Sequence, residues 1–423
     1  MTEDFLHYIW RNELFNHEEL TTSLGEEVKV IKPGEHNTHS GPDFFNSRIK
    51  IGKTTWAGNV EIHLRSSDWK KHLHHRDQSY DNVILHVVYE DDEPVFRKNG
   101  NVIPVISLKN KMDNLRWEEY VGFIENKDWI PCGSQLKEFD SLLLTNWLDR
   151  MLTQRLESRY DEISKLLEIN KNNWEEVFYQ RLLRNFGFNI NSEPFQLLSR
   201  SLPFSCLAKH KNNLLQIEAL LFGQAGFLTD SFSDDYPNEL KKEFRFLRNK
   251  FNLIPLEKHL WKFLRMRPGN FPTLRIAQSA KLFHSASHMF SMILETEHVD
   301  EIKHLMNVSA SSYWDNHYLF DSPSPPCIKR LGLDAIHSII INTLVPVLFV
   351  YGIRKRDEHV KEKAIRFLEE IPSENNYIIR KWEKSGIKVH NAFHSQALLF
   401  LKNEYCSQKK CLTCGIGMKL LNK

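Results

Sequence analysis

The fold is decided by residues 40–86, which read SGPDFFNSRIKIGKTTWAGNVEIHLRSSDWKKHLHHRDQSYDNVILH. A Gly-Pro-Asp turn opens the segment, and an alternating stretch follows that carries Glu61 and His63. Because side chains alternate between the two faces of a strand, Glu61 and His63 share one face, while Val60 and Ile62 point the other way. An acid and an imidazole side by side predict a polar face that can hold a divalent cation. The alternative is a half-buried strand whose polar face is only solvated.

The sequence around this stretch predicts an α/β domain of about a hundred residues. Apolar residues at helical spacing predict a helix near the start, and alternating or wholly apolar runs predict strands, separated by turn residues such as Gly52-Lys53 and Asn99-Gly100. The predicted order is helix 3–15, strands 28–31, 43–51 and 55–64, helix 66–75, and strands 83–89 and 102–108.

Beyond residue 110 strand patterns become rare and helical patterns prevail. The sequence therefore predicts an α+β protein: an α/β sandwich over residues 1–110, a linker over 111–135, and a mainly α-helical part over 136–423. The chain shows no repeat of fixed period.

Composition narrows the class of protein. Lys and Arg (56) nearly balance Asp and Glu (54), so a nucleic-acid role requires a local basic patch. The opening residues MTEDFLHYIW do not resemble a signal peptide, and the apolar run 337–351 is short for a membrane span and contains Pro346, which favours a buried core helix. Six Cys without an export signal favour a reducing compartment. We therefore expect a cytoplasmic protein with no membrane partner.

Asp43 joins Glu61 and His63 as a candidate site residue. Pairing across the Gly52-Lys53 turn brings Asp43 close to register with Glu61, and two carboxylates held that close repel each other unless a cation or a proton lies between them. The three side chains are therefore expected to converge on one polar pocket.

The order αβββαβ, with Pro42-Asp43 on one strand and Glu61-Ile62-His63 on the next, resembles the core of the PD-(D/E)xK nuclease superfamily. The resemblance implies a restriction-endonuclease-like sandwich and a metal-dependent phosphodiesterase acting on DNA or RNA. It also implies catalytic roles for Asp43, Glu61 and His63, with Asp43 and Glu61 binding Mg²⁺ or Mn²⁺. The third position is usually Lys in the superfamily and is His63 here. An imidazole can act as a base near pH 7 or ligate a softer metal.

This departure leaves two other functions open. One is a non-catalytic nucleic-acid-binding or scaffold protein that keeps only the nuclease-like fold and binds a protein partner through its helical half. The other is a different metal hydrolase built from the His-rich segment after Glu61, in which Asp68 and His72 would share a helix face. His72 and His74 share no face unless the segment leaves the helix. We expect Trp56, Trp69 and His86 to lie in the core.

The last part of the chain carries a C-x4-C-x2-C cluster made of Cys406, Cys411 and Cys414. Such spacing is typical of a metal or redox site, and three thiolates need a fourth ligand. Cys132, His390 and His394 are candidates for that ligand. Zinc and an iron–sulfur cluster are both open, and the alternative is a set of reduced, partly buried thiols. Some nucleases of the superfamily named above have a C-terminal iron–sulfur cluster completed by a distant Cys, a pattern that Cys132 resembles.

The whole chain also resembles a family of uncharacterised bacterial proteins, common among the Bacteroidetes, that contain a domain of unknown function. The phrases that carry this resemblance are SGPDFFNSRI, WAGNVEIHLRSSDW, YDNVILHVVYE, IPC at 130–132 and YCSQKKCLTCGIG. The resemblance implies an architecture and no activity.

Overall fold

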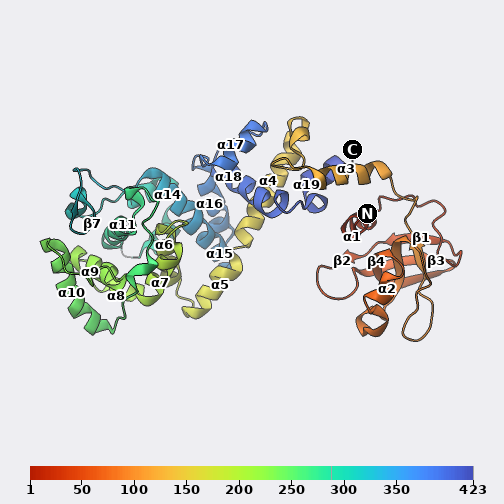
Figure 1. Cartoon of the computed structure of the whole chain (residues 1–423), viewed down its shortest axis with the longest axis horizontal. Coiled ribbons are helices and arrows are strands. Elements are labelled where there is room, and N and C mark those ends of the chain that lie inside the picture. The colour runs from red at the N-terminus through yellow and green to blue at the C-terminus, as the bar shows by residue number, and fades with distance from the viewer. Residues whose placement is uncertain (287, 423) are drawn as a thin grey trace. The chain divides into compact units, whose positions relative to one another are not determined.

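The computed structural model describes residues 1–286 and 288–422, which form two compact units. Unit 1 comprises Met1–Trp147 together with Leu401–Lys423, and unit 2 comprises Leu148–Phe400. Unit 1 holds a mixed β-sheet and unit 2 is mostly helical, which confirms the predicted α+β class (Figure 1). Residues 111–135, predicted to form a linker, lie inside unit 1, and so do the residues after Phe400 that the sequence assigned to the helical part.

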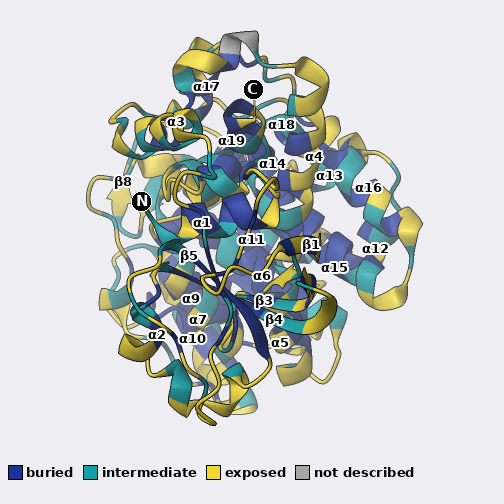
Figure 2. Ribbon diagram, turned by 90° about the vertical axis from the view of Figure 1, so that its right-hand side faces the viewer, coloured by how far each residue is buried: buried dark blue, intermediate teal, exposed yellow. Residues whose placement is uncertain are grey.

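The sheet of unit 1 has strand order β1-β3-β4-β5-β6, with β2 paired to the outer part of β3. Strands β1, β3 and β4 pair antiparallel, whereas β4, β5 and β6 pair parallel. The strands are β1 (Val28–Lys32), β2 (Glu35–His36), β3 (Phe44–Ile51), β4 (Thr54–Arg65), β5 (Val83–Glu90) and β6 (Val105–Ser107). Strand β5 is buried along most of its length (Figure 2), whereas β4 is buried only in its second half.

Helix α1 (Glu3–Arg11) packs against β4 and begins at Thr2, whose side-chain oxygen accepts a hydrogen bond from the Phe5 N–H. Parallel strands need a crossover connection, and the one between β4 and β5 contains the short helix α2 (Asp68–Lys71) and the 3₁₀ turns η1 (His74–Arg76) and η2 (Gln78–Tyr80). The crossover therefore brings the His-rich segment beside the end of β4 that carries Glu61 and His63.

A β-bulge shifts the register between β3 and β4. Ser47 pairs with Gly58, but Phe44 pairs with Val60, so β3 holds one extra residue over this interval. Asn46 in the bulge has φ 56, a left-handed conformation that Asn tolerates better than most residues. The extra residue aligns the next position outward, Asp43, with Glu61. Without it Asp43 would oppose Ile62 and point to the other face.

The remainder of unit 1 is helical. It consists of α3 (Asn114–Glu125), η3 (Gly133–Glu138), the start of α4 (Ser141–Glu157), the π-helical turn η8 (Leu401–Cys406), η9 (Cys411–Thr413) and α19 (Gly415–Leu421). Helix α19 packs against α3, and the Arg116 guanidinium donates hydrogen bonds to the Leu421 carbonyl and the Asn422 side chain. Unit 1 is thus assembled from segments far apart in the sequence.

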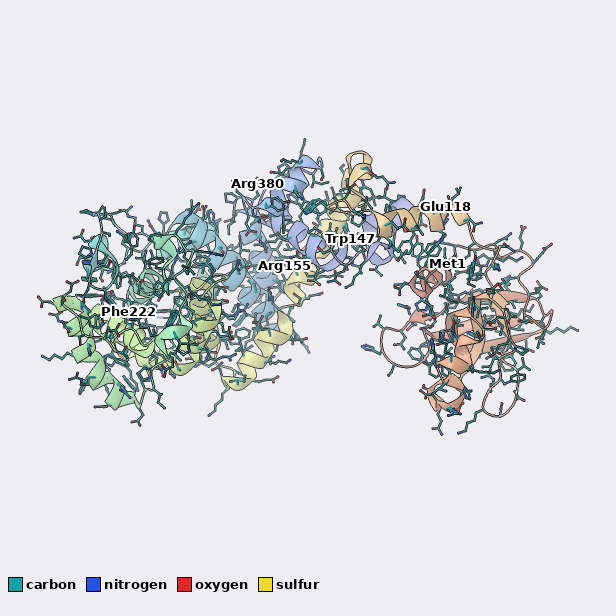
Figure 3. All side chains as sticks on the ribbon, in the orientation of Figure 1. Met1, Glu118, Trp147, Arg155, Phe222 and Arg380 are labelled. Carbon is teal, nitrogen blue, oxygen red and sulfur yellow. The ribbon has the colours of Figure 1, made fainter. Side chains whose placement is uncertain are left out.

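Unit 2 is an array of helices around an apolar core. Phe222, labelled in Figure 3, lies fully buried among these helices and stacks on Trp314 with ring centroids 5.3 Å apart. The helices are α5 (Tyr160–Ile169), α6 (Trp174–Phe186), α7 (Ser192–Ser201), α8 (Phe204–Ala208), α9 (Leu214–Gln224), α10 (Asp235–Phe251), α11 (Pro272–Ser285), α12 (Met289–Glu295), α13 (Val299–Met306), α14 (Leu333–Ile339), α15 (Val345–Lys355), α16 (Glu358–Glu369), α17 (Tyr377–Lys384) and α18 (Ala392–Phe400), with a small hairpin of β7 (His317–Leu319) and β8 (Ser322–Pro323).

One continuous helical segment of unit 2, Leu333–Lys355, has the length and mean hydropathy of a membrane span. It comprises α14, a π-helical turn (Ile340–Leu344) and α15, and 72% of its most apolar window is buried inside the protein. The segment is longer than the apolar run predicted from sequence because the helix continues through Pro346. Its burial is that of a core helix.

Candidate metal centre

Glu61 and His63 lie on β4 within the buried part of unit 1. Their side chains share one face of the strand, as the alternation predicts, and the residues are only 4% and 2% exposed. Both faces of the strand are covered here, since Val60 and Ile62 are buried as well. The predicted alternative of a solvated polar face does not describe this strand, because the polar side chains are enclosed.

Four potential ligand atoms converge beside β4, and His63 Nε2 lies at their centre. His63 Nε2 is 3.1 Å from His72 Nδ1, 3.3 Å from His74 Nε2 and 3.6 Å from Glu61 Oε1. His74 Nε2 is 3.3 Å from the same Glu61 oxygen. The ligand atoms of the three His all lie within 4.8 Å of one another. We call Glu61, His63, His72 and His74 the His–Glu cluster.

The crossover segment supplies His72 and His74 because it leaves the helix between them. Helix α2 ends at Lys71, and Leu73 adopts a left-handed conformation with φ 62 before η1 begins. This reversal brings His72 and His74, two residues apart, to the same nitrogen of His63. A left-handed non-Gly residue is strained, and such strain collects at functional sites. Tyr80 from the next turn stacks on the His74 ring at 3.9 Å.

His86 on the neighbouring strand β5 holds the His63 ring from behind. Its Nε2 lies 2.8 Å from His63 Nδ1, and β4 and β5 pair so that Glu61 is opposite His86. When His63 Nδ1 donates its proton to His86, His63 Nε2 keeps a free lone pair directed at His72, His74 and Glu61. A second partner that fixes the tautomer in this way is typical of metal-ligating His.

Asp43 contacts the cluster through the backbone as well as its carboxylate. The Asp43 N–H donates to Glu61 Oε2 at 3.1 Å, and the Ile62 N–H donates to Asp43 Oδ2 at 2.9 Å. His7 of α1 places its Nε2 3.3 Å from the same Asp43 oxygen. The structure thus brings Asp43, Glu61 and His63 to one place, with Glu61 between the other two.

Burial controls the protonation of the cluster. It raises the pKa of Glu61 to about 9, and the nearby Asp43 carboxylate adds to this rise. Burial together with the neighbouring imidazoles lowers the pKa of His63 to about 2, and burial and His72 lower that of His74 to about 4. At neutral pH these two imidazoles are therefore neutral and offer lone pairs, while Glu61 holds a proton that a cation can displace.

The spacing of the donors fits a small divalent cation. A tetrahedral ion bound at 2.0–2.1 Å holds its ligand atoms about 3.3–3.4 Å apart. The separations from His63 Nε2 to the other three donors, 3.1–3.6 Å, and from His74 Nε2 to Glu61 Oε1, 3.3 Å, are close to this value. Ring nitrogens facing one another at this distance cannot all be satisfied by mutual hydrogen bonds, because His63 Nε2 faces three partners. Exposure increases from buried His63 through His74 to exposed His72, so one side of the cluster is open to solvent.

Other acidic and aromatic side chains of the same stretch of sequence have structural partners or lie away from the cluster. Asp68 accepts a hydrogen bond from the Arg65 N–H and pairs with Lys71, and Asp77 caps η2. Trp69 is buried as predicted, but Trp56 is 50% exposed because this end of β4 extends beyond the packed core. The sequence did not predict that His7 and His86 belong to the site. His7 is on helix α1, far away in the sequence, and His86 is inside the apolar strand β5, so no motif surrounds either residue.

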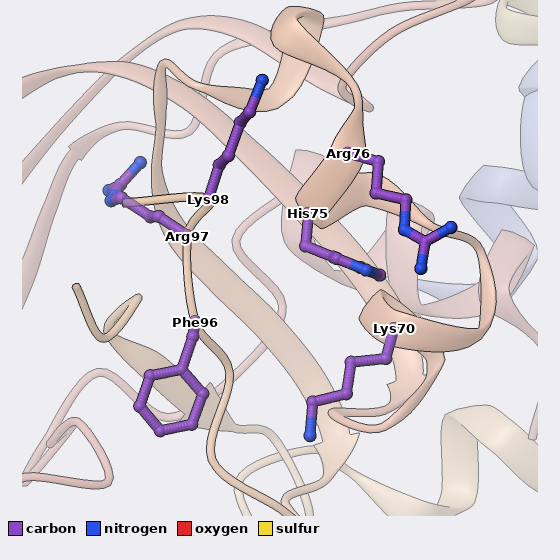
Figure 4. A pocket seen from close by; sticks show the side chains of 6 residues that line it. All are labelled: Lys70, His75, Arg76, Phe96, Arg97 and Lys98. Carbon is purple, nitrogen blue, oxygen red and sulfur yellow. The ribbon is translucent and has the colours of Figure 1, made fainter. Parts of the chain in front are cut away.

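A basic pocket of about 500 Å³ lies beside the same crossover (Figure 4). One wall comes from α2 and η1 and the other from the loop after β5, and Phe96 on the second wall is 42% exposed. Lys70 is paired with Glu93 at 3.0 Å, and Arg97 donates to the Asp81 carbonyl. The residues that line this basic pocket are Lys70, His75, Arg76, Phe96, Arg97 and Lys98.

The four Cys predicted as metal ligands, Cys132, Cys406, Cys411 and Cys414, all belong to unit 1. Cys132, Cys411 and Cys414 are buried and Cys406 is partly buried. The other two candidates for a fourth ligand, His390 and His394, belong to unit 2.

A family model described as a protein of unknown function (DUF2851) matches residues 3–377. The chain belongs to this family. The DUF2851 match spans the whole His–Glu cluster and the basic pocket, and its description assigns no activity to either. No curated protein and no solved structure matches the chain.

Proposed function

We propose that the protein is a metal-dependent phosphodiesterase acting on nucleic acid, and that the His–Glu cluster holds its cation. The observation that carries this proposal is the convergence of Glu61 Oε1, His72 Nδ1 and His74 Nε2 on His63 Nε2, from which they lie 3.1–3.6 Å away. The order of helix and strands that resembles a PD-(D/E)xK core is further support. Because three of the four donors are imidazoles, we expect Zn²⁺ or Mn²⁺ to bind better than Mg²⁺.

A cation at this place would supply positive charge for the phosphoryl oxygens and lower the pKa of a bound water. The residues of the chain have separate roles. His63 acts as a ligand and not as a base, because one of its nitrogens is bonded to His86 and the other faces three donors. Asp43 orients Glu61 through its backbone N–H, while its carboxylate accepts a hydrogen bond from the Ile62 N–H and lies 3.3 Å from His7 Nε2.

The basic pocket supports a nucleic-acid substrate. The segment from Lys70 to Arg76 lines the pocket with Lys70, His75 and Arg76 and contributes His72 and His74 to the cluster, so one stretch of chain serves both. Lys98 on the opposite wall is exposed, and exposed Phe96 offers a face on which a base can stack. All six Cys are free thiols, which supports a cytoplasmic location.

The same pocket supports a second candidate function, nucleic-acid binding without cleavage. In that case the His–Glu cluster would hold a cation that only stabilises unit 1. Binding by the pocket is common to both functions, and turnover separates them.

The test is cleavage of single-stranded and double-stranded DNA and RNA by the purified protein with Zn²⁺, Mn²⁺ or Mg²⁺ added to the chelated enzyme. We expect cleavage that depends on the metal and is lost in Asp43→Ala and His63→Ala. His17→Ala, an exposed His of unit 1 outside the cluster, is the matched control and should keep full activity.

Binding is measured in parallel by fluorescence anisotropy. We expect Lys98→Glu to weaken binding of a short single strand about tenfold and Lys53→Glu, in the exposed hairpin turn, to leave it unchanged. Tight binding without cleavage under any of the three metals would exclude the enzyme and favour the second function. Neither binding nor cleavage would exclude both.

A further inference from the structure

A second polar cavity, of about 270 Å³, lies entirely within unit 2. It is enclosed where helix α6 packs against α5, α7 and the π-helical turn Ile340–Leu344. Its described lining includes Arg159, Arg181 and Arg184 and no acidic residue, and we call it the arginine cavity. A single water needs only about 10–15 Å³, so the cavity has room for a phosphate group and part of the molecule that carries it.

Helix α6 supplies most of the polar lining. Arg181, Arg184 and Asn185 are spaced i, i+3 and i+4, so their side chains lie on one face of this helix. Arg181 is only 3% exposed, and a guanidinium so far from water needs hydrogen-bond acceptors. Its Nη1 donates to Glu162, but its buried Nε has no acceptor among the described residues. The lining therefore contains a buried cationic donor that the protein itself does not satisfy.

The charges of the cavity are not balanced. Among the described residues Glu162 is the only carboxylate in ion-pair contact with these arginines: it contacts Arg181 and lies 3.5 Å from Arg159. Arg184 Nε donates at 3.2 Å to the side chain of Gln196, which is a neutral acceptor. Three guanidinium groups against one carboxylate leave two positive charges. Burial lowers the pKa of Arg181 and Glu162 opposes this, while the charges of the other two arginines add to the decrease.

Helix α7 begins at the cavity with Ser192. The first N–H groups of a helix have no partner within the helix and carry partial positive charge. The Asn191 side chain does not cap them, because it donates to the Lys262 carbonyl and accepts from the Lys262 N–H, both at 2.9 Å. A Cβ on Gly187 would clash with the Asn191 backbone, so Gly is required for α7 to begin so close to the end of α6.

The π-helical turn forms another wall, and side chains hold it in place. The Asn185 side chain donates to the Asn342 carbonyl at 3.2 Å and to the Thr343 hydroxyl at 2.7 Å. The Arg155 guanidinium donates to the Asn342 side-chain oxygen at 3.3 Å. Such π-helical turns are frequent at functional sites. A wall that is fixed before a ligand arrives lowers the entropic cost of binding.

We propose that the arginine cavity binds a phosphate dianion, either free or as the phosphate group of a monoester. A dianion matches the two positive charges that Glu162 leaves unbalanced, whereas a carboxylate would neutralise only one of them. Guanidinium groups bind phosphate oxygens in pairs, and the N-terminus of α7 adds backbone donors. The site belongs to unit 2 and does not depend on the activity proposed for the His–Glu cluster.

The experiment is titration calorimetry on the full chain, freed of metal by a chelator so that no cation in unit 1 can hold phosphate. The probes are inorganic phosphate, adenosine 5′-phosphate and adenosine. We expect the first two to bind and adenosine not to bind. Tighter binding of adenosine 5′-phosphate identifies a monoester as the ligand, and equal affinities identify the phosphate group alone. Binding of neither phosphate compound, or equal binding of adenosine, would overturn the proposal.

Variants assign the binding to the cavity. Arg184→Gln removes a partly exposed guanidinium and should weaken phosphate binding about tenfold or more. Arg200→Gln, at an exposed position of α7, changes the net charge equally and should bind as the native chain does. Equal affinities of these two variants would contradict the proposal. Binding that Lys98→Glu loses and Arg184→Gln keeps would assign the phosphate to the basic pocket of unit 1, and would overturn it as well.

Discussion

Units 1 and 2 bury ionisable side chains in different ways. In unit 2 a buried cation is paired with an acid or with carbonyl groups: Arg181 contacts Glu162, and Lys363 donates to the Leu294 carbonyl and lies 3.8 Å from Glu297. In unit 1 buried imidazoles face one another beside a buried carboxyl: His63 Nε2 lies 3.1 Å from His72 Nδ1, 3.3 Å from His74 Nε2 and 3.6 Å from Glu61 Oε1. In these contacts of unit 2 each buried cation has an acceptor. The neutral imidazoles of unit 1 present lone pairs to one another and lack a cation, so their arrangement indicates that a ligand binds there.

The largest expected effect is in unit 2 and concerns stability alone. Phe222→Ala removes a fully buried ring and should lower the free energy of unfolding by about 3–5 kcal/mol, because a large cavity remains. Denaturant unfolding measures the loss, and metal analysis should show unchanged metal content in the folded fraction. Loss of metal from the folded variant would show that packing in unit 2 affects the His–Glu cluster.

The next effect concerns His63, the residue that the other donors of the His–Glu cluster approach. His63→Ala removes the nitrogen on which the other donors converge and should weaken Zn²⁺ binding at least about 100-fold, which is about 2.7 kcal/mol. Titration calorimetry on the chelated protein gives the affinity, with His17→Ala as the control. Equal Zn²⁺ affinities of His63→Ala and His17→Ala would contradict the assignment of a metal site to the His–Glu cluster.

A smaller effect is expected behind the cluster. His86→Leu replaces the imidazole with an apolar side chain of similar volume and so removes the acceptor for His63 Nδ1. Zn²⁺ affinity should therefore fall by about 10–100-fold. The same calorimetric titration applies. An affinity as low as that of His63→Ala would make His86 a ligand in its own right, and no change would remove it from the site.

The smallest effect concerns Glu218, a buried acid of unit 2 that no cation pairs with in the contacts described above. Burial raises the pKa of Glu218 to about 7, so the folded protein holds a proton there that the unfolded chain releases, and stability falls as the pH rises from about 4.5 through 7. Glu218→Gln removes this dependence and should gain about 1–2 kcal/mol relative to the native chain between pH 5 and pH 8. Parallel pH slopes of the two unfolding free energies would contradict the assignment.

The sequence predicts the sheet well because the signals are local. Alternation in β4, the apolar run of β5 and the turn at Gly52 are each read from a few neighbouring residues. The convergence of Asp43 with Glu61 was also predicted, although the register was made by a bulge at Asn46 that the sequence indicates only weakly.

The rest of the site depends on features that are not local. Leu is not a residue type that indicates a left-handed conformation, so the turn at Leu73 could not be predicted. The sequence therefore predicted that His72 and His74 come together only if the segment leaves the helix. His7 and His86 reach the site through packing between elements. The docking of α19 on α3 joins segments from opposite ends of the chain, which no short pattern encodes.

The division of unit 1 into two stretches of sequence has a consequence for biosynthesis. Residues 1–147 leave the ribosome first, but α19 follows only after all of residues 148–400 have been translated. Helix α3, against which α19 packs, therefore stays without this partner while the helical unit emerges. A nascent chain that stalls or is cut anywhere within unit 2 lacks α19, so unit 1 is incomplete in every such truncated product.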